Sequence, residues 1–197
     1  MSRRNLILIV ACVVGLIFLG GAAWRAGVFD QGEAAGTALV GGPFQMVDQN
    51  GKAVDQSILK GKWSAVFFGF TYCPDVCPTT LQTLAAAQQE LGDKADRLQV
   101  VFVSVDPERD TPEQLKTYLS NEVFPKGTIG LTGTPEQVAA MAKAYRAYFK
   151  KNGEGQDYLM DHSTAIYLMN PKGEFATVLR HNSPPAELAK QIAEAIS

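Results

Sequence analysis

Histidine and cysteine are scarce in this chain, which holds only two histidines and three cysteines among its 197 residues. That scarcity excludes a small scaffold held by several disulfides, because such scaffolds need at least four cysteines. Charge is also low and balanced, with 19% charged residues and a net charge of −2. No cluster of lysine and arginine interleaved with aromatic residues is present, so we expect no nucleic-acid partner. Catalytic serine triads, phosphate-binding loops and paired glycosidase carboxylates have no local signature either.

One long apolar run does occur, at residues 6–24, which hold no charged side chain and follow two arginines. A run of about 20 apolar residues matches the thickness of a bilayer core. Arginines before the run predict that residues 1–5 stay in the cytoplasm and that the rest is exported. We therefore predict a transmembrane anchor at 6–24, a flexible tether at 25–42 and a globular domain at 43–197. A cleaved signal peptide is the alternative, and Cys12 within the run is expected to face lipid or to fill packing space.

The other two cysteines, Cys73 and Cys77, lie where a buried strand leads into a helix. Residues 66–70 form a continuous apolar run, which is typical of a strand buried on both faces. Pro78 favours a helix that begins near Cys77 and leaves Cys73 in the preceding loop. Helical side chains four residues apart lie roughly 5–6 Å from each other, which permits a shared metal ion or a disulfide. The start of a helix also favours the thiolate form, which is both nucleophile and ligand. The competing interpretation is a pair of small buried apolar residues.

The rest of the chain predicts an ordered series of strands and helices. Two helices share the start Thr-Pro-Glu-Gln, at Thr111 and at Thr134, in which threonine caps the helix and glutamine closes a capping box. The first elements expected are a hairpin at 44–54, a strand at 64–70, the cysteine helix to 92 and a strand at 98–105. The first Thr-Pro-Glu-Gln helix follows, then a short strand at 128–131 and the second such helix to Phe149. The chain ends with a loop at 150–156, strands at 164–169 and 175–179, and a helix from 184 or 185 to 196. This order predicts an α/β thioredoxin-like fold with an N-terminal hairpin and an inserted helical segment, preceded by one transmembrane helix.

His162 directly precedes the third core strand of this plan. In a thioredoxin-like sheet that segment adjoins the start of the cysteine helix, so the imidazole is expected within reach of both sulfurs. The alternative is that His162 is simply a hydrogen-bonded residue at the end of a strand. His181 follows the last strand and is expected in a solvated loop. A structural zinc site needs four ligands, and the fourth would require His181 to fold back. Two thiolates suit Cu(I), and an imidazole with an added ligand suits Cu(II), so copper is the predicted metal. Asp161 would then orient the imidazole, or be a solvated turn residue.

Three segments of the chain resemble the Sco/SenC family of copper-binding assembly proteins. They are residues 68–78 with the motif CPDVC, residues 104–111 with SVDPERDT, and residues 161–163 with DHS. The likeness covers about residues 41–195 together with the preceding anchor. It implies that Cys73, Cys77 and His162 bind copper in a domain facing the periplasm or the intermembrane space. The short N-terminus lacks a mitochondrial transit sequence, which favours a bacterial inner-membrane protein.

The resemblance also implies a function and partners. It implies delivery of copper to the binuclear copper centre of cytochrome c oxidase, with the subunit that holds this centre as partner. A second periplasmic copper carrier or a thiol reductase is a further implied partner. The alternative function is a thiol–disulfide oxidoreductase that reduces the cysteines of the oxidase site, with Cys73 and Cys77 as the redox pair and no required role for His162. A peroxide-reducing enzyme needs an arginine beside its cysteine, and Arg109 is only a distant candidate.

Overall fold

The computed structural model describes residues 40–196 of the chain. The predicted cytoplasmic segment, the anchor and most of the tether lie outside these residues. Within residues 40–196, no helix is both long enough and apolar enough to cross a membrane. Contacts with the domain begin before residue 43, because the Gly41 N–H donates to the Ala144 carbonyl oxygen at 2.9 Å.

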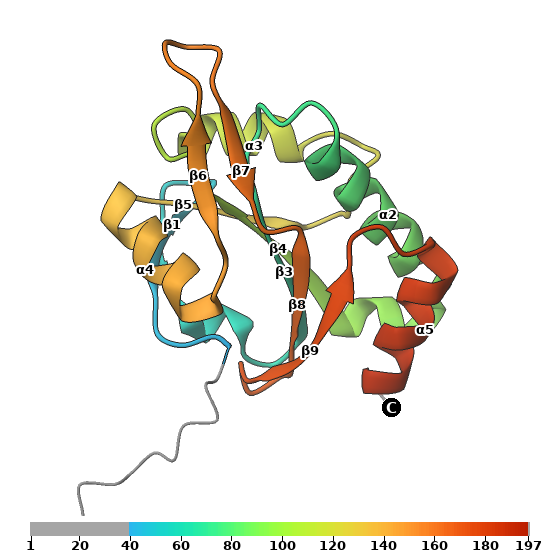
Figure 1. Cartoon of the computed structure of the whole chain (residues 1–197). Helices are drawn as coiled ribbons and strands as arrows, with labels where there is room; N and C mark the ends of the chain where they lie inside the picture. The colour runs from blue at the N-terminus through green and yellow to red at the C-terminus, as the bar shows by residue number, and fades with distance from the viewer. Residues whose placement is uncertain (1–39, 197) are drawn as a thin grey trace, which may run out of the picture. The chain divides into compact units, whose positions relative to one another are not determined.

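A seven-stranded sheet forms the centre of the domain, with strand order β2-β1-β5-β4-β3-β8-β9 (Figure 1). The strands β3, β4 and β5 run parallel, whereas β1, β2, β8 and β9 join antiparallel. Their bounds are β1 Gln45–Asp48, β2 Ala53–Asp55, β3 Trp63–Gly69, β4 Leu98–Ser104, β5 Ile129–Thr132, β8 Ala165–Met169 and β9 Phe175–Arg180. In β3 every residue except the first is buried, and in β4 every residue except the second is buried. This burial is expected for strands covered on both faces.

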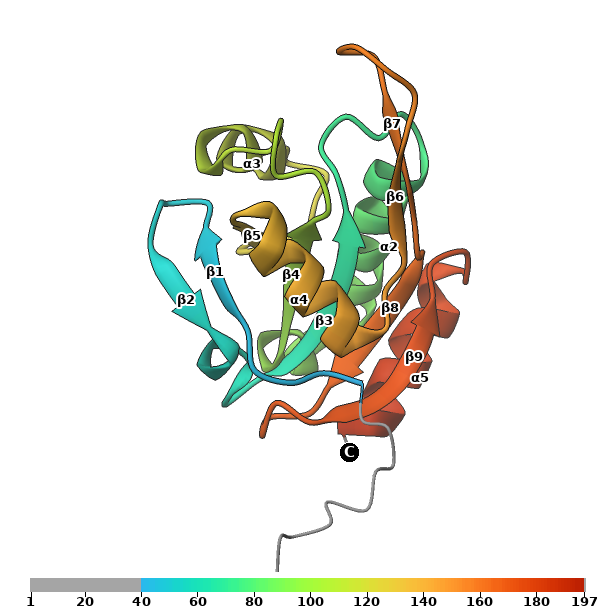
Figure 2. The same ribbon diagram turned by 60° about the vertical axis from the view of Figure 1, so that its left-hand side comes forward.

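Helices cover both faces of this sheet. The helices α2 (Val76–Glu90) and α5 (Pro185–Ile196) pack together on one face, and α4 (Pro135–Tyr145) lies across the other (Figure 2). The short helix α3 (Pro112–Leu119) packs along β5. Two 3₁₀ turns, η1 (Gln56–Leu59) and η2 (Gly92–Arg97), complete the elements that lead into β3 and β4. The mixed α/β arrangement expected from the sequence is confirmed, with ends within two residues for most elements.

The hairpin of β6 (Phe149–Asn152) and β7 (Leu159–His162) is the exception. It pairs as a separate two-stranded sheet, and it projects beyond the main sheet (Figure 1). The predicted loop at 150–156 is therefore wrong for 150–152, because an exposed strand rich in lysine has no apolar alternation to reveal it. The predicted extension of the second helix to Phe149 is also wrong. Arg146 adopts the left-handed conformation with φ 55°, which ends α4 at Tyr145.

Candidate metal centre

The two cysteines lie at the junction between β3 and α2. Cys77 is fully buried in the first turn of α2, and Cys73 is half-buried in the turn before it. Asp75 stands at the N-cap of α2 but makes no side-chain capping hydrogen bond. The Cys77 N–H instead donates to the Cys73 sulfur at 3.4 Å. A sulfur thus takes the place of the usual capping oxygen, where the helix dipole favours a negative charge.

Gly69, the last residue of β3, makes room for the buried cysteine. A Cβ atom at this position would lie 2.7 Å from the Cys77 sulfur and 2.8 Å from the Phe102 ring. Both separations are far inside van der Waals contact. Only glycine lets Cys77 pack directly on the strand.

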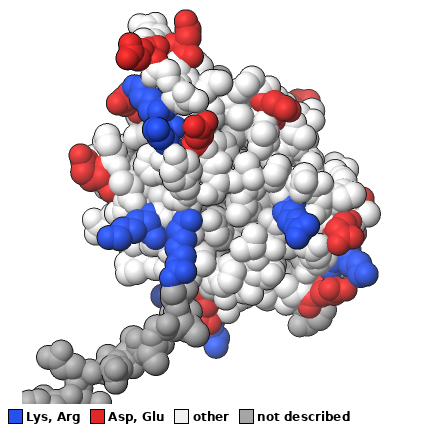
Figure 3. Space-filling view, in the orientation of Figure 1, with Lys and Arg blue, Asp and Glu red and all other residues white. Residues whose placement is uncertain are grey.

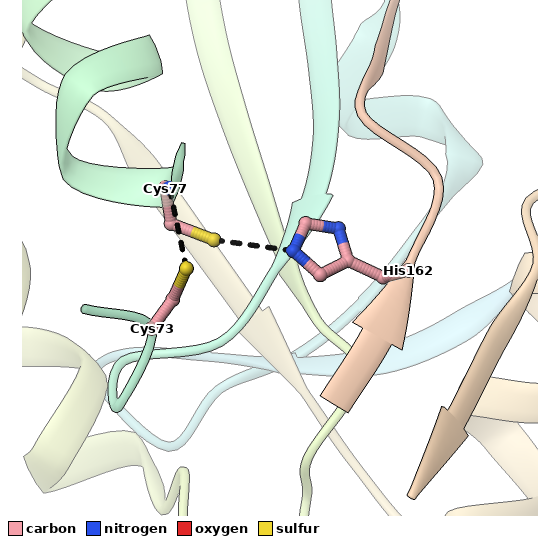
Figure 4. Close-up of side chains that lie close together, drawn as sticks. All are labelled: Cys73, Cys77 and His162. Carbon is pink, nitrogen blue, oxygen red and sulfur yellow. Dashed lines mark hydrogen bonds between the residues drawn. The ribbon is translucent and has the colours of Figure 1, made fainter. Parts of the chain in front are cut away.

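His162, the last residue of β7, points its ring toward the sulfurs (Figure 4). Its Nε2 atom lies 3.5 Å from the Cys77 sulfur, and its Nδ1 atom lies 3.0 Å from the Ser163 carbonyl oxygen. A carbonyl oxygen can only accept, so Nδ1 carries the hydrogen and Nε2 keeps a free lone pair. The rings of Phe67 and Phe70 pack edge-on against the imidazole at 6.1 and 5.8 Å between centroids. The imidazole is thus held with its unprotonated nitrogen facing the sulfurs.

Together the three side chains form one compact donor group. Their ligand atoms all lie within 4.8 Å of one another, and within residues 40–196 this is the one group of three or more cysteine, histidine or acidic side chains close enough to share a metal ion. Two ligands of one ion stand at most about 4.6 Å apart, twice a Zn–S bond length. Small side-chain adjustments therefore suffice to bring all three onto one ion. Their role as metal ligands stays a prediction.

The two thiols have opposite electrostatic environments. Hydrogen bonding from the Cys77 thiol lowers the pKa of Cys73 from 9.0 to about 4. His162 lowers this pKa less, through a hydrogen bond that Nε2 donates only when the imidazole carries a second proton. The pKa of Cys77 is raised, first because its proton is donated to Cys73 and then because it is buried. At neutral pH the pair therefore carries one thiolate, on the more exposed sulfur, which is the reactive and metal-binding form.

A buried acidic residue, Asp110, holds the cysteine turn through hydrogen bonds to Thr71. Asp110 is fully buried, and its carboxylate accepts hydrogen bonds from the Thr71 N–H at 3.0 Å, the Thr71 hydroxyl at 2.6 Å and the Ser104 hydroxyl at 2.6 Å. Burial raises the pKa of Asp110 despite these bonds. Sequence reasoning missed this role. The signal in the sequence was an acidic residue six positions after the apolar strand β4. In the fold this position lies next to the end of the neighbouring strand β3, where Thr71 follows.

The other polar residues considered, His181, Asp161 and Arg109, do not join the donor group, and neither does Asp157 in the loop of the β6–β7 hairpin. His181 is half-buried in the turn after β9 and does not join the group. Asp161 is exposed and lines a cleft of about 270 Å³ beside Cys73, whereas Asp157 lines a different cleft of about 650 Å³. The guanidinium of Arg109 is engaged by Asp106 and by two tyrosine rings. Within residues 40–196, none of these contacts joins the guanidinium to a cysteine sulfur, as a peroxide-reducing enzyme requires.

Comparison with known proteins gives consistent matches. The family model SCO1/SenC matches residues 32–197. Protein SCO2, mitochondrial, of Saccharomyces cerevisiae is 43% identical over 171 residues, which are 85% of this chain and 56% of that protein. The structure of Bradyrhizobium japonicum ScoI with copper bound is 45% identical, covers 79% of this chain and 98% of that chain, and has a TM-score of 0.71.

A third match concerns redox chemistry. BsSco, described as a member of the Sco family of cytochrome c oxidase assembly proteins with a disulfide switch, is 26% identical, covers 80% of this chain and 92% of that chain, and has a TM-score of 0.64. The chain spans about half the length of the first curated relatives it matches. These structures confirm the thioredoxin-like α/β fold predicted from the order of elements.

Proposed function

Since the chain belongs to the SCO1/SenC family, we propose that it binds copper through Cys73, Cys77 and His162 and delivers the ion to the binuclear copper centre of cytochrome c oxidase. The observation that carries this proposal is the convergence of two sulfurs and an unprotonated imidazole nitrogen within 4.8 Å. Copper bound to the similar Bradyrhizobium protein supports the choice of metal.

The chemistry of the donor set favours copper over zinc. A structural zinc site closes its tetrahedron with four protein ligands, and within residues 40–196 no fourth cysteine, histidine or acid joins the group. Thiolates are soft ligands that suit Cu(I), and the imidazole extends the set toward Cu(II). The half-exposed Cys73 is the sulfur that a partner's ligand reaches first, whereas Cys77 is enclosed. Transfer by ligand exchange would therefore begin at Cys73.

The proposed partner is the copper-centre subunit of the oxidase, with a periplasmic copper carrier or a thiol reductase acting before it. The description of BsSco as a member of a family of oxidase assembly proteins supports this assignment. We further propose that residues 6–24 anchor the chain in a bacterial inner membrane, with residues 43–197 in the periplasm. The arginines before this uncharged run support that orientation.

A second function, thiol–disulfide exchange, is favoured by the contrast between the two thiols. The Cys73 thiolate would attack a disulfide of the oxidase subunit, form a mixed disulfide and release one subunit thiolate. Cys77 would then lose its proton and attack the Cys73 sulfur, releasing the second subunit thiolate and closing a Cys73–Cys77 disulfide. Two electrons pass to the subunit, and a dithiol reductase must return them. This reaction prepares the subunit cysteines for copper, so the two functions are compatible.

Copper titration of the full-length chain in detergent tests the first function, with the two histidines as matched sites. We expect His162→Ala to weaken copper binding by on the order of 10²-fold, about 3 kcal/mol for one lost ligand. His181→Ala should bind like the wild type, because His181 lies outside the donor group. Equal affinities for both variants would remove His162 from the ligand set and leave dithiol exchange as the function.

A further inference from the structure

The β6–β7 hairpin brings His162 to the sulfurs, yet it is not part of the main sheet. It forms its own two-stranded sheet, and an isolated two-stranded hairpin is marginally stable at best. Contacts outside its ladder must therefore hold β7, and with it His162, beside the cysteines.

Close packing does not supply all of that support. A mainly apolar cavity of about 170 Å³ lies beneath the hairpin, between Phe149 and Met160 on one side and Val105 and Val138 on the other. Because the cavity leaves part of the space between the hairpin and the core unfilled, packing alone permits small shifts of the hairpin. A directional contact is needed to fix its distance from the cysteine turn.

Arg109, in the loop after β4, makes such a contact with both halves of the site. Its guanidinium carbon lies 4.6 Å from the centre of the Tyr72 ring and 3.6 Å from the centre of the Tyr158 ring. Tyr72 directly precedes Cys73, and Tyr158 directly precedes β7. One planar cation thus contacts Tyr72, the residue before Cys73, and Tyr158, the residue before the strand that carries His162.

The same guanidinium is anchored at fixed points. Its Nε atom donates to the buried Asp106 carboxylate, and Nη1 donates to the Gln156 carbonyl oxygen in the hairpin at 3.1 Å. Asp106 also accepts a hydrogen bond of 2.6 Å from the Tyr158 hydroxyl. Only 15% of the Arg109 side chain and 3% of the Asp106 side chain are exposed, so this ion pair is shielded from solvent. A lysine could keep the ion pair but could not reproduce the planar stack and the fork of donors.

Lys151 offers a natural control in the same hairpin. Its ammonium group lies 3.8 Å from the centre of the Tyr158 ring and pairs with Glu108 at 2.8 Å. Figure 3 shows charged side chains of both signs gathered at the top of the view, where the hairpin lies in Figure 1. Lys151 is a cation over the same ring, but within residues 40–196 its charged group contacts Tyr158 and Glu108 and not Tyr72 or the cysteine turn. An exposed pair of this kind contributes little to stability.

We propose that Arg109 is a positioning residue that couples the cysteine turn to the β6–β7 hairpin and fixes the separation between the two sulfurs and the His162 imidazole. Its consequence for copper rests on the proposed function, whereas the coupling itself is a property of the metal-free chain. Functional groups must be held within about 0.5 Å of their working geometry, so loosening this contact should weaken the site without removing any ligand.

Amide hydrogen exchange of the metal-free, full-length chain in detergent tests the coupling directly. In Arg109→Lys we expect β7 amides at 159–162 to exchange about tenfold faster, because the hairpin opens locally, while α5 amides keep their wild-type rates. Copper affinity should fall by about tenfold, as for other outer contacts of metal ligands. The sulfur-to-Cu(II) charge-transfer band should shift, which a uniform loss of stability would not cause. Lys151→Met should leave all three readouts at their wild-type values.

The outcomes separate the coupling from the copper function. If Arg109→Lys behaves like Lys151→Met in exchange and in the spectrum, Arg109 does not position the site. If Arg109→Lys fails to fold, Tyr72→Leu decides, because Tyr72 is 51% exposed and its replacement should be tolerated. Faster exchange at residues 71–75 in that variant supports the coupling, and an unchanged rate overturns it. A wild-type chain that binds no copper while Arg109→Lys loosens β7 would reject the copper function alone.

Discussion

The sulfurs and the imidazole of the site are supported in different ways. Cys77 packs on a strand paired along its whole length in the centre of the sheet, and Asp110 secures the turn that holds Cys73. His162 comes from a hairpin that pairs only with itself among the described residues. Ligands built into the core share its stability, whereas a ligand on an appended hairpin depends on a few side-chain contacts. The core half of the site, which holds Cys73 and Cys77, and the hairpin half, which holds His162, should therefore respond differently to mutation.

The first way to sharpen this comparison uses the pKa of Cys73, which both halves lower. Alkylation of Cys73 follows its thiolate, so the rate should rise to a plateau with a midpoint near pH 4, whereas an ordinary thiol is still rising at pH 8. At pH 6 the thiolate fraction exceeds that of an ordinary thiol by on the order of 10²-fold. Cys77→Ala should shift the midpoint upward more than His162→Ala, because the Cys77 hydrogen bond is the larger cause.

The sign of the matching stability effect follows from the same shift. The pKa of Cys73 is lower in the folded chain than in the unfolded chain, so ionisation favours folding. This contribution is fully present above about pH 9 and is lost as the pH falls toward about 4. Mass mapping of the alkylated residue checks the profile, with the buried Cys77 expected to stay unlabelled. A larger shift in His162→Ala than in Cys77→Ala would contradict the dominance of the core half.

A second test compares one glycine in each half. Gly69→Ala places a Cβ against the Cys77 sulfur and the Phe102 ring, so we expect a loss of about 3 kcal/mol in the free energy of unfolding, the upper end for overpacking. Gly155, in the hairpin loop, has φ +74° and open space around it. Gly155→Ala should cost only about 1 kcal/mol of backbone strain.

Urea denaturation followed by circular dichroism measures both glycine variants. Copper affinity should fall in Gly69→Ala, because the Cys77 sulfur must move, and should hardly change in Gly155→Ala. Equal losses of stability in the two variants would mean that the hairpin is as tightly integrated as the core strand.

The elements around the core half of the site were predicted better from the sequence than the β6–β7 hairpin, for a physical reason. Buried strands such as β3 and β4 leave continuous apolar runs, and the prolines fix the helix starts, so both are visible in local sequence. The hairpin has exposed lysines on β6 and no alternating pattern, so its first strand was predicted as a loop. His162 was predicted from its place before a core strand, but the contacts that hold it are tertiary. The links from Asp110 to Thr71 and from Arg109 to the two tyrosines leave no local pattern.

The two Thr-Pro-Glu-Gln helix starts give the smallest and most controlled comparison. Identical local sequence predicts two identical capping boxes, and at Thr134 the Gln137 side chain does accept the Thr134 N–H at 2.8 Å. At Thr111 the threonine caps the helix, but the Gln114 amide donates instead to the Thr71 hydroxyl at 3.1 Å. Tertiary context therefore redirects one glutamine from its own helix to the cysteine turn.

Alanine substitution of each glutamine should separate the two uses. We expect Gln137→Ala to lower the free energy of unfolding by about 0.5–1 kcal/mol through the lost capping contact, with no change in the alkylation rate of Cys73. Gln114→Ala should cost no more stability, because its bond is only partly buried, yet it should change that rate by about twofold, since it loosens the turn two residues before Cys73. Urea denaturation and alkylation at pH 6 measure the pair. If both variants alkylate at the wild-type rate, the Gln114 contact is only structural, and Asp110 alone among these groups holds the turn.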